Sequence, residues 1–268
     1  MIAPRILTSG VPVPPYDATV SDTVETTVTT VMASLACGAL VFALVYWWRT
    51  GRPTVLALFF AGGAMMLLEP FVDVVGGCWH PNDLARVFTL WDRPMPVWLC
   101  LTYFVYFGVG GGLSWIVLRR GMSSGLLWGL FISSAVGDAV MEMILMHWNT
   151  YLYYGAQPLV LLKFPLWWAP VNSLVDVAVA VAIVRYENAL RGPRAVLIIP
   201  LAMAISAAIN TVAGFPSWTA INSNIDGIGG ALLGLATFAI SAVIVRLLAD
   251  PKVTAPATAR PEVPALVG

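Results

Sequence analysis

The stretch VGDAVMEMILMHWN, residues 136–149, places Asp138 and Glu142 inside a run that is otherwise apolar. The two carboxyl groups are four residues apart, so on a helix both would point from the same face. A charged group at bilayer depth costs roughly 2.5–3.5 kcal/mol on insertion scales. If this stretch crosses a membrane, the pair must therefore face the interior of a helix bundle and not lipid.

The composition of the whole chain favours a membrane environment. Of its 268 residues, 59% are hydrophobic and only 10% are charged, and the mean hydropathy is +0.83. Both values lie outside the usual range of soluble globular domains. The formal net charge is zero, which gives no reason to expect nucleic acid as a partner. We therefore expect a lipid bilayer to surround most of the chain.

Apolar runs long enough to cross a bilayer, roughly 20 residues each, occur seven times. They cover residues 28–48, 53–75, 97–118, 124–146, 166–184, 195–213 and 225–247. The sequence therefore predicts an all-α integral membrane protein, a bundle of about seven transmembrane helices. Its parts would be an extracytoplasmic N-terminal leader (1–27), a membrane domain (28–248) and a disordered cytoplasmic tail (249–268).

The basic residues favour one orientation of this bundle. Ten of the 14 fall on one side if there are seven spans: Arg49, Arg52, Arg119, Arg120, Arg185, Arg191, Arg194, Arg246, Lys252 and Arg260. Loops that carry an excess of Lys and Arg stay in the cytoplasm. We expect a multi-pass protein of the cell membrane with its N-terminus outside and its C-terminus inside, so that loops 76–96 and 147–165 lie outside.

Further polar pairs repeat the four-residue spacing at a similar depth. Glu69 and Asp73 lie late in the second span, and Asn172 and Asp176 lie early in the fifth. A single pair would be explained by hydrogen bonding between helices, but three pairs at one depth favour a functional site. Burial away from water favours the neutral form of a carboxyl group, which can donate a proton. The candidate catalytic residues are Glu69, Asp73, Asp138 and Glu142.

Two other polar residues extend this set toward the sixth and seventh spans. Asn210 would lie near the outer end of the sixth span, and Asp226 would lie at the outer start of the seventh. Because Asp226 follows SNI directly before an apolar run, an N-terminal cap of the last helix is its simplest role.

The two outer loops are rich in aromatic residues and contain both histidines of the chain. Ring faces carry partial negative charge and stabilise cations, so aromatic walls beside acids suit cationic cyclisation of a lipophilic molecule. An aromatic belt at the membrane surface is the simpler explanation for part of this set. The candidate substrate-binding residues are Trp79, His80, Trp98, His147, Trp148, Tyr151, Tyr154, Trp168, Asn172 and Asp176.

The sequence offers no motif for a soluble cofactor. It contains no Walker loop, and GVGGG at 108–112 lies inside an apolar run, where it favours close helix packing. An Asp-rich motif that would hold magnesium and a diphosphate is also missing. The expected partners are thus a lipophilic small molecule and the bilayer, with no cofactor.

A metal site is also not expected from the sequence. The three cysteines, Cys37, Cys78 and Cys100, form no CxxC motif and are interpreted as small apolar fillers. A site made of Glu69, His80, Glu142 and His147 is a minor alternative.

An offset of 69 residues relates two parts of the chain. It aligns Glu69 with Asp138, Asp73 with Glu142, Trp79 with Trp148, Pro96 with Pro165 and Trp98 with Trp167. The matches predict two related helix pairs in a parallel repeat, with the site between them. Chance similarity is the alternative explanation.

The order of EPFVD (69–73), an aromatic loop, a D-xxx-E helix, YLYYGAQPL (151–159) and FPLWWAPVN (164–172) resembles the actinobacterial AveC-like membrane proteins, which include spiroketal-forming cyclase/dehydratases. The likeness covers roughly residues 60–185. The chain departs from the family at Glu69, where Asp is more common, and at Asp73, where Asn is more common, which leaves the substrate class open. In size, span number and paired acids the chain is also similar to small integral-membrane terpene cyclases. Both resemblances imply ring closure by an intramembrane acid.

The sequence thus favours a membrane-embedded acid/base cyclase, with a terpenoid substrate slightly preferred and polyketide spiroketal formation or dehydration next. A proton-coupled transporter could use the same carboxyl groups, but it would need a polar path to the cytoplasmic side. The inner halves of the spans, such as VLALFF (55–60) and AVAVAIV (178–184), are apolar. A membrane scaffold without chemistry is the third possibility.

Overall fold

The computed structural model describes residues 12–250, and within this part seven helices are long and apolar enough to cross a membrane. The helices are α1 (Asp22–Thr50), α2 (Thr54–Met65), α3 (Glu69–Gly76), α4 (Val97–Tyr103), α5 (Gly110–Leu118), α6 (Ser124–His147), α7 (Trp168–Arg185), α8 (Ile198–Asn222) and α9 (Gly227–Leu248). A 3-10 turn joins α2 to α3, and a π-helix joins α4 to α5, so each pair forms one long helix. The all-α prediction is confirmed.

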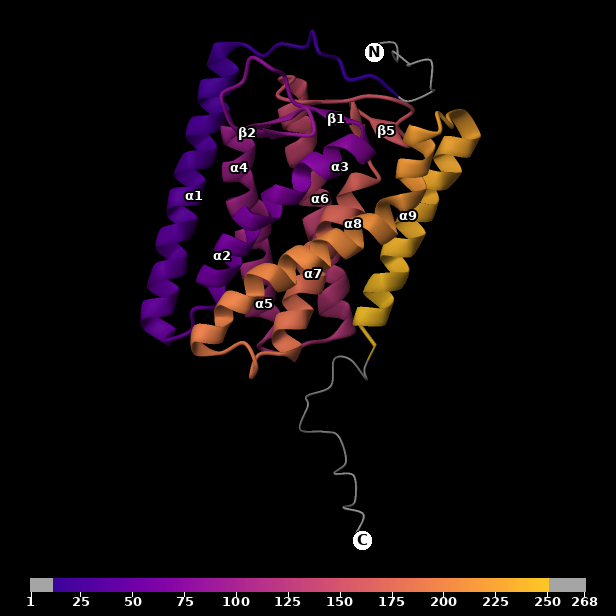
Figure 1. Cartoon of the computed structure of the whole chain (residues 1–268). Coiled ribbons are helices and arrows are strands. Elements are labelled where there is room, and N and C mark those ends of the chain that lie inside the picture. The colour runs from indigo at the N-terminus through magenta and orange to yellow at the C-terminus, as the bar shows by residue number, and fades with distance from the viewer. Residues whose placement is uncertain (1–11, 251–268) are drawn as a thin grey trace.

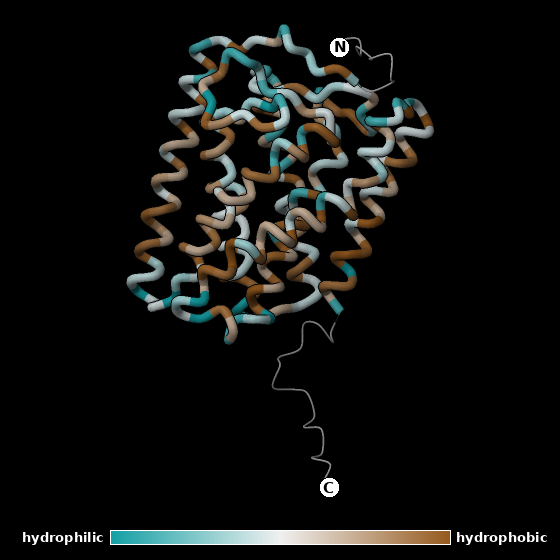
Figure 2. The backbone as a smooth tube through the Cα atoms, in the orientation of Figure 1, coloured by the Kyte–Doolittle hydropathy of each residue, from teal (hydrophilic) through white to brown (hydrophobic). Residues whose placement is uncertain are grey.

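The helices run up and down between two ends of the bundle (Figure 1). One end, here called the loop face, holds the segment before α1 and the connections 77–96 and 148–167. The opposite end, the arginine face, holds Arg49, Arg52, Arg119, Arg120, Arg185, Arg191, Arg194 and Arg246. Figure 2 shows hydrophilic residues gathered at both ends and hydrophobic residues between them. The predicted clustering of basic residues at one end is therefore confirmed for the described part, and Lys252 and Arg260 lie outside it.

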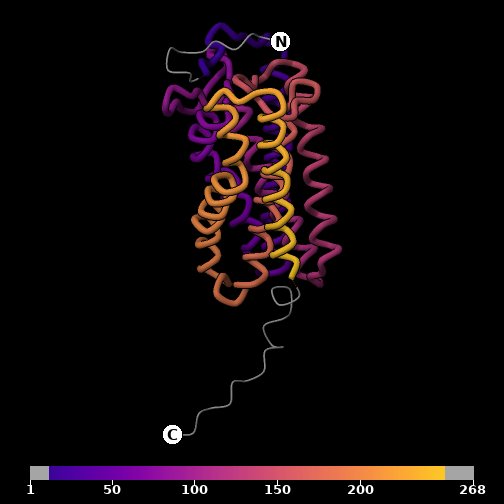
Figure 3. The backbone as a smooth tube through the Cα atoms, turned by 90° about the vertical axis from the view of Figure 1, so that its right-hand side faces the viewer, coloured from indigo at the N-terminus to yellow at the C-terminus, as the bar shows by residue number. Residues whose placement is uncertain are grey.

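Helix α7 occupies the centre of the bundle, where it packs against α5, α6, α8 and α9. In its most apolar window 78% of the residues are buried, compared with 17% in α1, which lies at the periphery. Figure 3 shows α9 alongside α8 on one flank of the bundle. Polar side chains on α7 consequently face protein, which is the placement that a helix inside a membrane would require.

Helix α2 and the π-helix approach each other closely because each has a glycine at the contact. A Cβ atom at Gly62 would lie 2.5 Å from the backbone nitrogen of Gly108, and one at Gly108 would lie 2.9 Å from the Cα atom of Phe59. Only residues without a side chain allow this distance. The predicted role of the GVGGG stretch in helix packing is confirmed.

The first helix begins earlier than predicted, at Asp22 and not at residue 28. The Ser21 hydroxyl accepts a hydrogen bond from the N–H of Val24 at 3.4 Å and caps the helix. The preceding residues cross the loop face, where the Tyr16 hydroxyl donates to Asp92 at 3.1 Å. Part of the predicted leader is thus ordered on the bundle, whereas residues 1–11 and the predicted tail from 251 onward lie outside the described residues.

The sixth helix ends later than predicted, because it continues through Pro216 to Asn222. A proline removes one helical hydrogen bond but does not end a helix that its neighbours support in apolar surroundings. Asn210 is therefore 12 residues, about 18 Å, before the end of α8, and its predicted place near the outer end is wrong. Asp226 occupies the N-cap position of α9, but its side chain makes no capping hydrogen bond.

Three short antiparallel pairs give the loop face a defined structure. Strand β1 (Cys78–Trp79) pairs with β4 (Leu152–Tyr153), β2 (Arg86–Leu90) with β3 (Arg93–Pro96), and β5 (Val160–Leu161) with β6 (Phe164–Pro165). The first pair joins two connections that are distant in sequence, and the other two are hairpins that lead into α4 and α7. The loops are therefore held in place above the helices that carry the acids.

Candidate active site

A cavity of about 80 Å³ lies between α3, α4, α6, α7 and α8, close to the loop face. All four candidate catalytic residues line it: Glu69, Asp73, Asp138 and Glu142. Ser206 and Asn210 of α8 supply further polar groups to its wall. The structure thus brings together the carboxyl pairs of the second and fourth spans, as their spacing and depth predicted.

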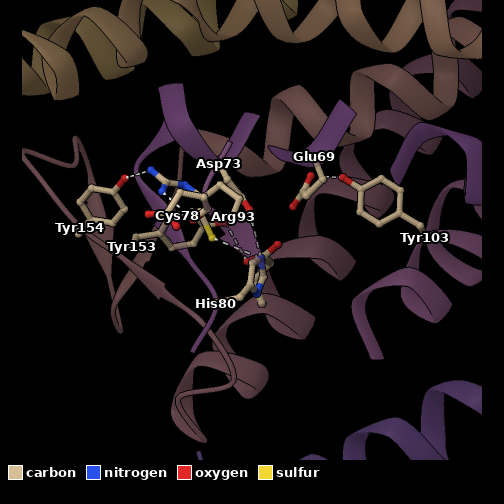
Figure 4. Close-up of polar contacts among 10 residues, drawn as sticks. Glu69, Asp73, Cys78, His80, Arg93, Tyr103, Tyr153 and Tyr154 are labelled. Atoms are coloured by element: carbon tan, nitrogen blue, oxygen red, sulfur yellow. Dashed lines mark hydrogen bonds and ion pairs between the residues drawn. The ribbon is translucent and has the colours of Figure 1, made fainter. Parts of the chain in front are cut away.

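The pair on α3 follows an interruption of the second long helix. The 3-10 turn Met66–Leu68 directly precedes α3, and Pro70 occupies its first turn, where a missing N–H costs least. The Glu69 carboxylate accepts a hydrogen bond from the Tyr103 hydroxyl (Figure 4). The Asp73 side chain, one turn further, is only 1% exposed.

The pair on α6 lies across the cavity on an unbroken helix. Asp138 accepts hydrogen bonds from the Asn172 amide at 3.4 and 3.5 Å. Glu142 accepts from the hydroxyls of Tyr151 and Tyr153, the latter at 3.2 Å. The hydrogen-bond donors to Glu69, Asp138 and Glu142 are thus neutral groups. Carboxyl groups held in this way stay available to exchange a proton with a guest in the cavity.

A turn after α3 brings the Cys78 thiol to the same wall and places the His80 imidazole next to it. Gly77 ends the helix in the left-handed region with φ of 65°, and the chain then continues as strand β1. Nε2 of His80 lies 3.5 Å from Oδ2 of Asp73 and 4.0 Å from Sγ of Cys78 (Figure 4). Burial, with a smaller contribution from Arg93, lowers the pKa of His80 to about 3, so the ring is neutral. Burial and the nearby Asp73 raise the pKa of the Cys78 thiol.

Arg93 is the cation closest to this group among the contacts that the structure shows. Its Nη2 donates to the Tyr154 hydroxyl at 2.7 Å, and its guanidinium lies 5.3 Å from the centre of the Trp79 ring. Burial raises the pKa of Tyr154 to about 12, although Arg93 acts in the opposite direction. Tyr154 is therefore a neutral anchor for Arg93 and does not line the cavity.

Only two of the ten predicted substrate-binding residues line the cavity, and the other eight do not. Trp168 and Asn172 line the cavity. The rings of Trp98 and Tyr151 stack with their centroids 5.9 Å apart, and the His80 ring packs on Tyr151 with a centroid distance of 5.6 Å. Together with Trp79, these side chains form a buried aromatic layer that does not line the cavity.

Three further predicted binding residues belong neither to the cavity wall nor to this aromatic layer. Asp176 lies one turn further along α7, within 3.5 Å of the Ser134 hydroxyl. His147 and Trp148 lie on the surface, with Trp148 45% exposed, so their predicted place at the site is wrong. The minor alternative of a metal held by Glu69, His80, Glu142 and His147 is wrong for the same reason.

Several lining residues were not predicted from the sequence. Tyr103 and Tyr106 project from the end of α4 and from the π-helix (Phe104–Val109), and Tyr153 projects from β4. A π-helix re-aims side chains and is frequent at functional sites. Two hydroxyl groups three residues apart in the third apolar run were the signal that could have found Tyr103 and Tyr106.

The internal repeat is consistent with some features of the structure and not with others. Pro96 and Pro165 each end a hairpin, and each is followed by a buried tryptophan, Trp98 or Trp167. The segments that follow α3 and α6 differ. Trp79 after α3 is 1% exposed, whereas Trp148 after α6 is 45% exposed. The two acid pairs nevertheless face one cavity between the two units.

Comparisons of the chain with family models, with curated proteins and with solved structures give no match. The resemblance to AveC-like proteins therefore stays a prediction.

Proposed function

We propose that the protein is an integral membrane enzyme that closes a ring at the oxygen-bearing end of a lipophilic molecule by acid/base catalysis. The observation that carries this proposal is the convergence of two carboxyl pairs, from α3 and α6, on one small cavity. Opposed carboxyl groups can divide the work, one as proton donor and one as acceptor.

A hydroxyketone illustrates the chemistry. Glu69 would donate a proton to the carbonyl oxygen while the hydroxyl oxygen attacks the carbonyl carbon and forms the new C–O bond. The hydroxyl proton would pass to Asp138, which faces the same cavity. The product is a cyclic hemiketal, an isomer of the substrate. Acid-assisted attack by a second hydroxyl, with loss of water, would give a spiroketal.

The size of the cavity limits which part of a substrate it can hold. Pockets for drug-sized ligands have volumes of roughly 300–1,000 Å³, whereas this cavity measures about 80 Å³. Only the reacting end of a long molecule fits such a space. The rest of the substrate would lie between helices or in the surrounding lipid, which suits a lipophilic chain.

Unpaired polar atoms favour an oxygenated substrate over a hydrocarbon. Nε1 of Trp168 and Oδ1 of Asn210 are buried without a hydrogen-bond partner among the described residues, and both residues line the cavity. A substrate hydroxyl or carbonyl would satisfy one donor and one acceptor. The predicted aromatic walls lie mostly behind the cavity, which weakens the argument for a pure polyene. A polyketide hydroxyketone or an oxygenated terpenoid fits better.

A proton-coupled transporter finds less support. Beyond Asp176 toward the arginine face, α7 carries apolar side chains, of which Val177, Val179 and Val181 are buried. A relay would need polar groups along this central helix. The acids therefore lie in a one-sided site.

The arginine face would lie in the cytoplasm, in accordance with the positive-inside rule. The cavity would then occupy the outer half of the membrane. A reporter fused to the C-terminus should be active in the cytoplasm, and activity only outside would overturn this orientation and with it the outer position of the cavity.

The function can be tested in lipid vesicles with a long-chain hydroxyketone and, in parallel, a polyene of similar length. Glu69→Gln and Asp138→Asn should each lower turnover by about 10² or more, because an amide can neither donate a strongly acidic proton, as Glu69 would, nor accept one, as Asp138 would. The matched control is Asp226→Asn, an exposed acid near the same face, which should keep the parental rate. Parental rates for both cavity variants would rule out acid initiation, and cyclisation of the polyene alone would overturn the oxygenated substrate.

A further inference from the structure

Three side chains with metal-binding atoms meet beside the cavity, and two of them, Asp73 and Cys78, line it. Asp73, Cys78 and His80 each offer one ligand atom, and these atoms lie within 4.8 Å of one another. The three residues are 1%, 5% and 1% exposed. Figure 4 shows the carboxylate, the thiol and the imidazole directed toward one another. A buried group of three different ligand types is distinct from an exposed acidic cluster.

The backbone positions these side chains firmly. The Gly77 N–H bonds to the Asp73 carbonyl and ends α3, so the acid is fixed at the start of the turn. Cys78 and His80 are two residues apart on extended chain, a spacing that places both side chains on one side. Pairing of Cys78 with Tyr153 holds the strand in register. The arrangement is therefore built by local structure on both sides of the turn.

The distances between ligand atoms are close to those of a tetrahedral zinc site. Bonds of about 2.0–2.3 Å from zinc to N, O and S imply ligand atoms roughly 3.3–3.7 Å apart. The measured separations are 3.5 Å between His80 and Asp73 and 4.0 Å between His80 and Cys78. All three ligand atoms lie within 4.8 Å of one another, so a small closing movement would complete the geometry.

The electrostatic surroundings attract a cation to this position. Asp73, Glu69 and Glu142 all lie close enough to act electrostatically on the Cys78 thiol, and each would favour a bound cation in its ionised form. Oδ2 of Asp73 is buried and has no hydrogen-bond partner among the described residues, so it has an unused lone pair. Arg93 opposes a second cation, but its guanidinium is held by Tyr154 and by the face of Trp79.

We infer that Asp73, Cys78 and His80 form a binding site for Zn²⁺ or a divalent metal of similar ligand preference. Asp73 and Cys78 line the cavity, so a fourth coordination position would open into it. Zinc with three protein ligands and one open position binds water or a substrate oxygen there. The inference goes beyond the proposed ring closure and does not depend on it, because metal binding can be measured without a substrate.

The test uses the full chain purified in detergent, stripped with a chelator and titrated with Co²⁺, which reports thiolate ligation by a near-ultraviolet charge-transfer band. One equivalent should bind with this band, and Zn²⁺ should displace it. Cys78→Ser should abolish the band, and His80→Gln should weaken binding by about 10-fold or more. The matched controls are Cys100→Ser and His147→Gln, whose side chains lie outside the group. Absence of the band in the parent, or its equal loss in the controls, would overturn the site.

A second measurement needs no variant and covers the case that a substitution disturbs folding. Zn²⁺ should protect Cys78 from a small thiol reagent in the parent protein, whereas the labelling of Cys37, which is exposed, should stay unchanged. Equal labelling of Cys78 with and without Zn²⁺ would contradict the inference. If Glu69→Gln and Asp138→Asn turn out to be fully active, the ring-closure proposal fails while both metal measurements keep their meaning.

Discussion

Residues 69–80 and 138–149 begin alike and end differently. Both start with two acids four residues apart that face the cavity. Helix α3 ends at Gly76, and the chain turns inward with Cys78 and His80. Helix α6 continues to His147, and the next residue remains exposed at the surface. The end point of the helix, and not its acid pair, decides whether the following residues reach the site.

The residue at position 77, and its counterpart at position 146, account for the different ends of the two helices. Gly77 adopts φ of 65°, a conformation that favours glycine and ends the helix. The aligned position of the second unit is Met146, which is 3% exposed and packs in the core as part of a continuing helix. A glycine and a methionine at equivalent positions thus send one histidine into the site and the other to the surface.

The largest effect is expected from removing this turn with Gly77→Ala. A Cβ atom would lie 2.6 Å from the Tyr154 carbonyl oxygen, in a backbone conformation that L-residues disfavour. We expect the free energy of unfolding to fall by about 2–4 kcal/mol, from the positive φ and the overlap together. Thermal melting in detergent would measure it.

The matched control is Gly137→Ala, next to Asp138 in the other unit. No atom lies within 4 Å of a Cβ atom there, and alanine is the better helix former by about 1 kcal/mol. Its melting temperature should stay equal or rise slightly. A similar loss in both variants would mean that Gly77 has no special role in ending α3.

The same comparison shows what could be predicted from the sequence. The long helices agree with the apolar runs within a few residues, except at the start of α1 and the end of α8, because each run has the length and composition of a membrane-spanning helix. The convergence of Glu69 and Asp138 followed from helical spacing and the cost of exposing acids to lipid. The end of α8 did not follow, because Pro216 breaks a helix in water but is tolerated where neighbouring helices support it.

The rest of the site depends on contacts between distant segments. Cys78 reaches the cavity wall because Gly77 ends a helix and because β1 pairs with β4, 75 residues further along the chain. No local pattern reveals that pairing. For the same reason Tyr153 was not predicted at the site, whereas His147, which ends α6 directly before an aromatic loop, was.

The contact between the two related helix pairs can be tested where α5 of the first pair packs against α7 of the second. A Cβ atom at Gly110 would lie 2.6 Å from Oδ2 of Asp176, whereas one at Gly111 would lie 3.6 Å from the nearest atom, in Leu58. Gly110→Ala should lower the free energy of unfolding by about 1–3 kcal/mol through overpacking, and Gly111→Ala should be neutral or stabilising. Equal melting temperatures of these neighbouring variants would show that Asp176 does not hold the two units together.

A smaller difference is expected between the tyrosines that bind the two glutamates. Glu69 accepts from Tyr103 alone, whereas Glu142 accepts from Tyr151 and Tyr153. Glu69 becomes negatively charged as it gives up its proton, and the Tyr103 hydroxyl would stabilise that charge. A hydrogen bond to a charged group contributes about 1.5–3 kcal/mol, so Tyr103→Phe should reduce turnover about 10-fold or more. Tyr151→Phe leaves one donor in place and should cost about 3-fold or less. Turnover is measured at saturating substrate. A larger loss in Tyr151→Phe than in Tyr103→Phe would indicate that catalysis depends more on the hydrogen bonds to Glu142 than on the one to Glu69.

The smallest effect is expected at the surface end of the second unit. His147 and Trp148 align with Cys78 and Trp79, but both are exposed and neither lines the cavity. Surface substitutions away from special features usually change stability by less than about 0.5 kcal/mol. His147→Gln and Trp148→Phe should therefore keep turnover within about 2-fold of the parent and leave the melting temperature unchanged. His80→Gln in the first unit is the informative partner, because it removes a buried ring 3.5 Å from Asp73. If His147→Gln lowered turnover as much as His80→Gln, the surface position of His147 at the end of α6 would not keep it out of the reaction. The conclusion that only the turn after α3 brings a histidine to the site would then be wrong.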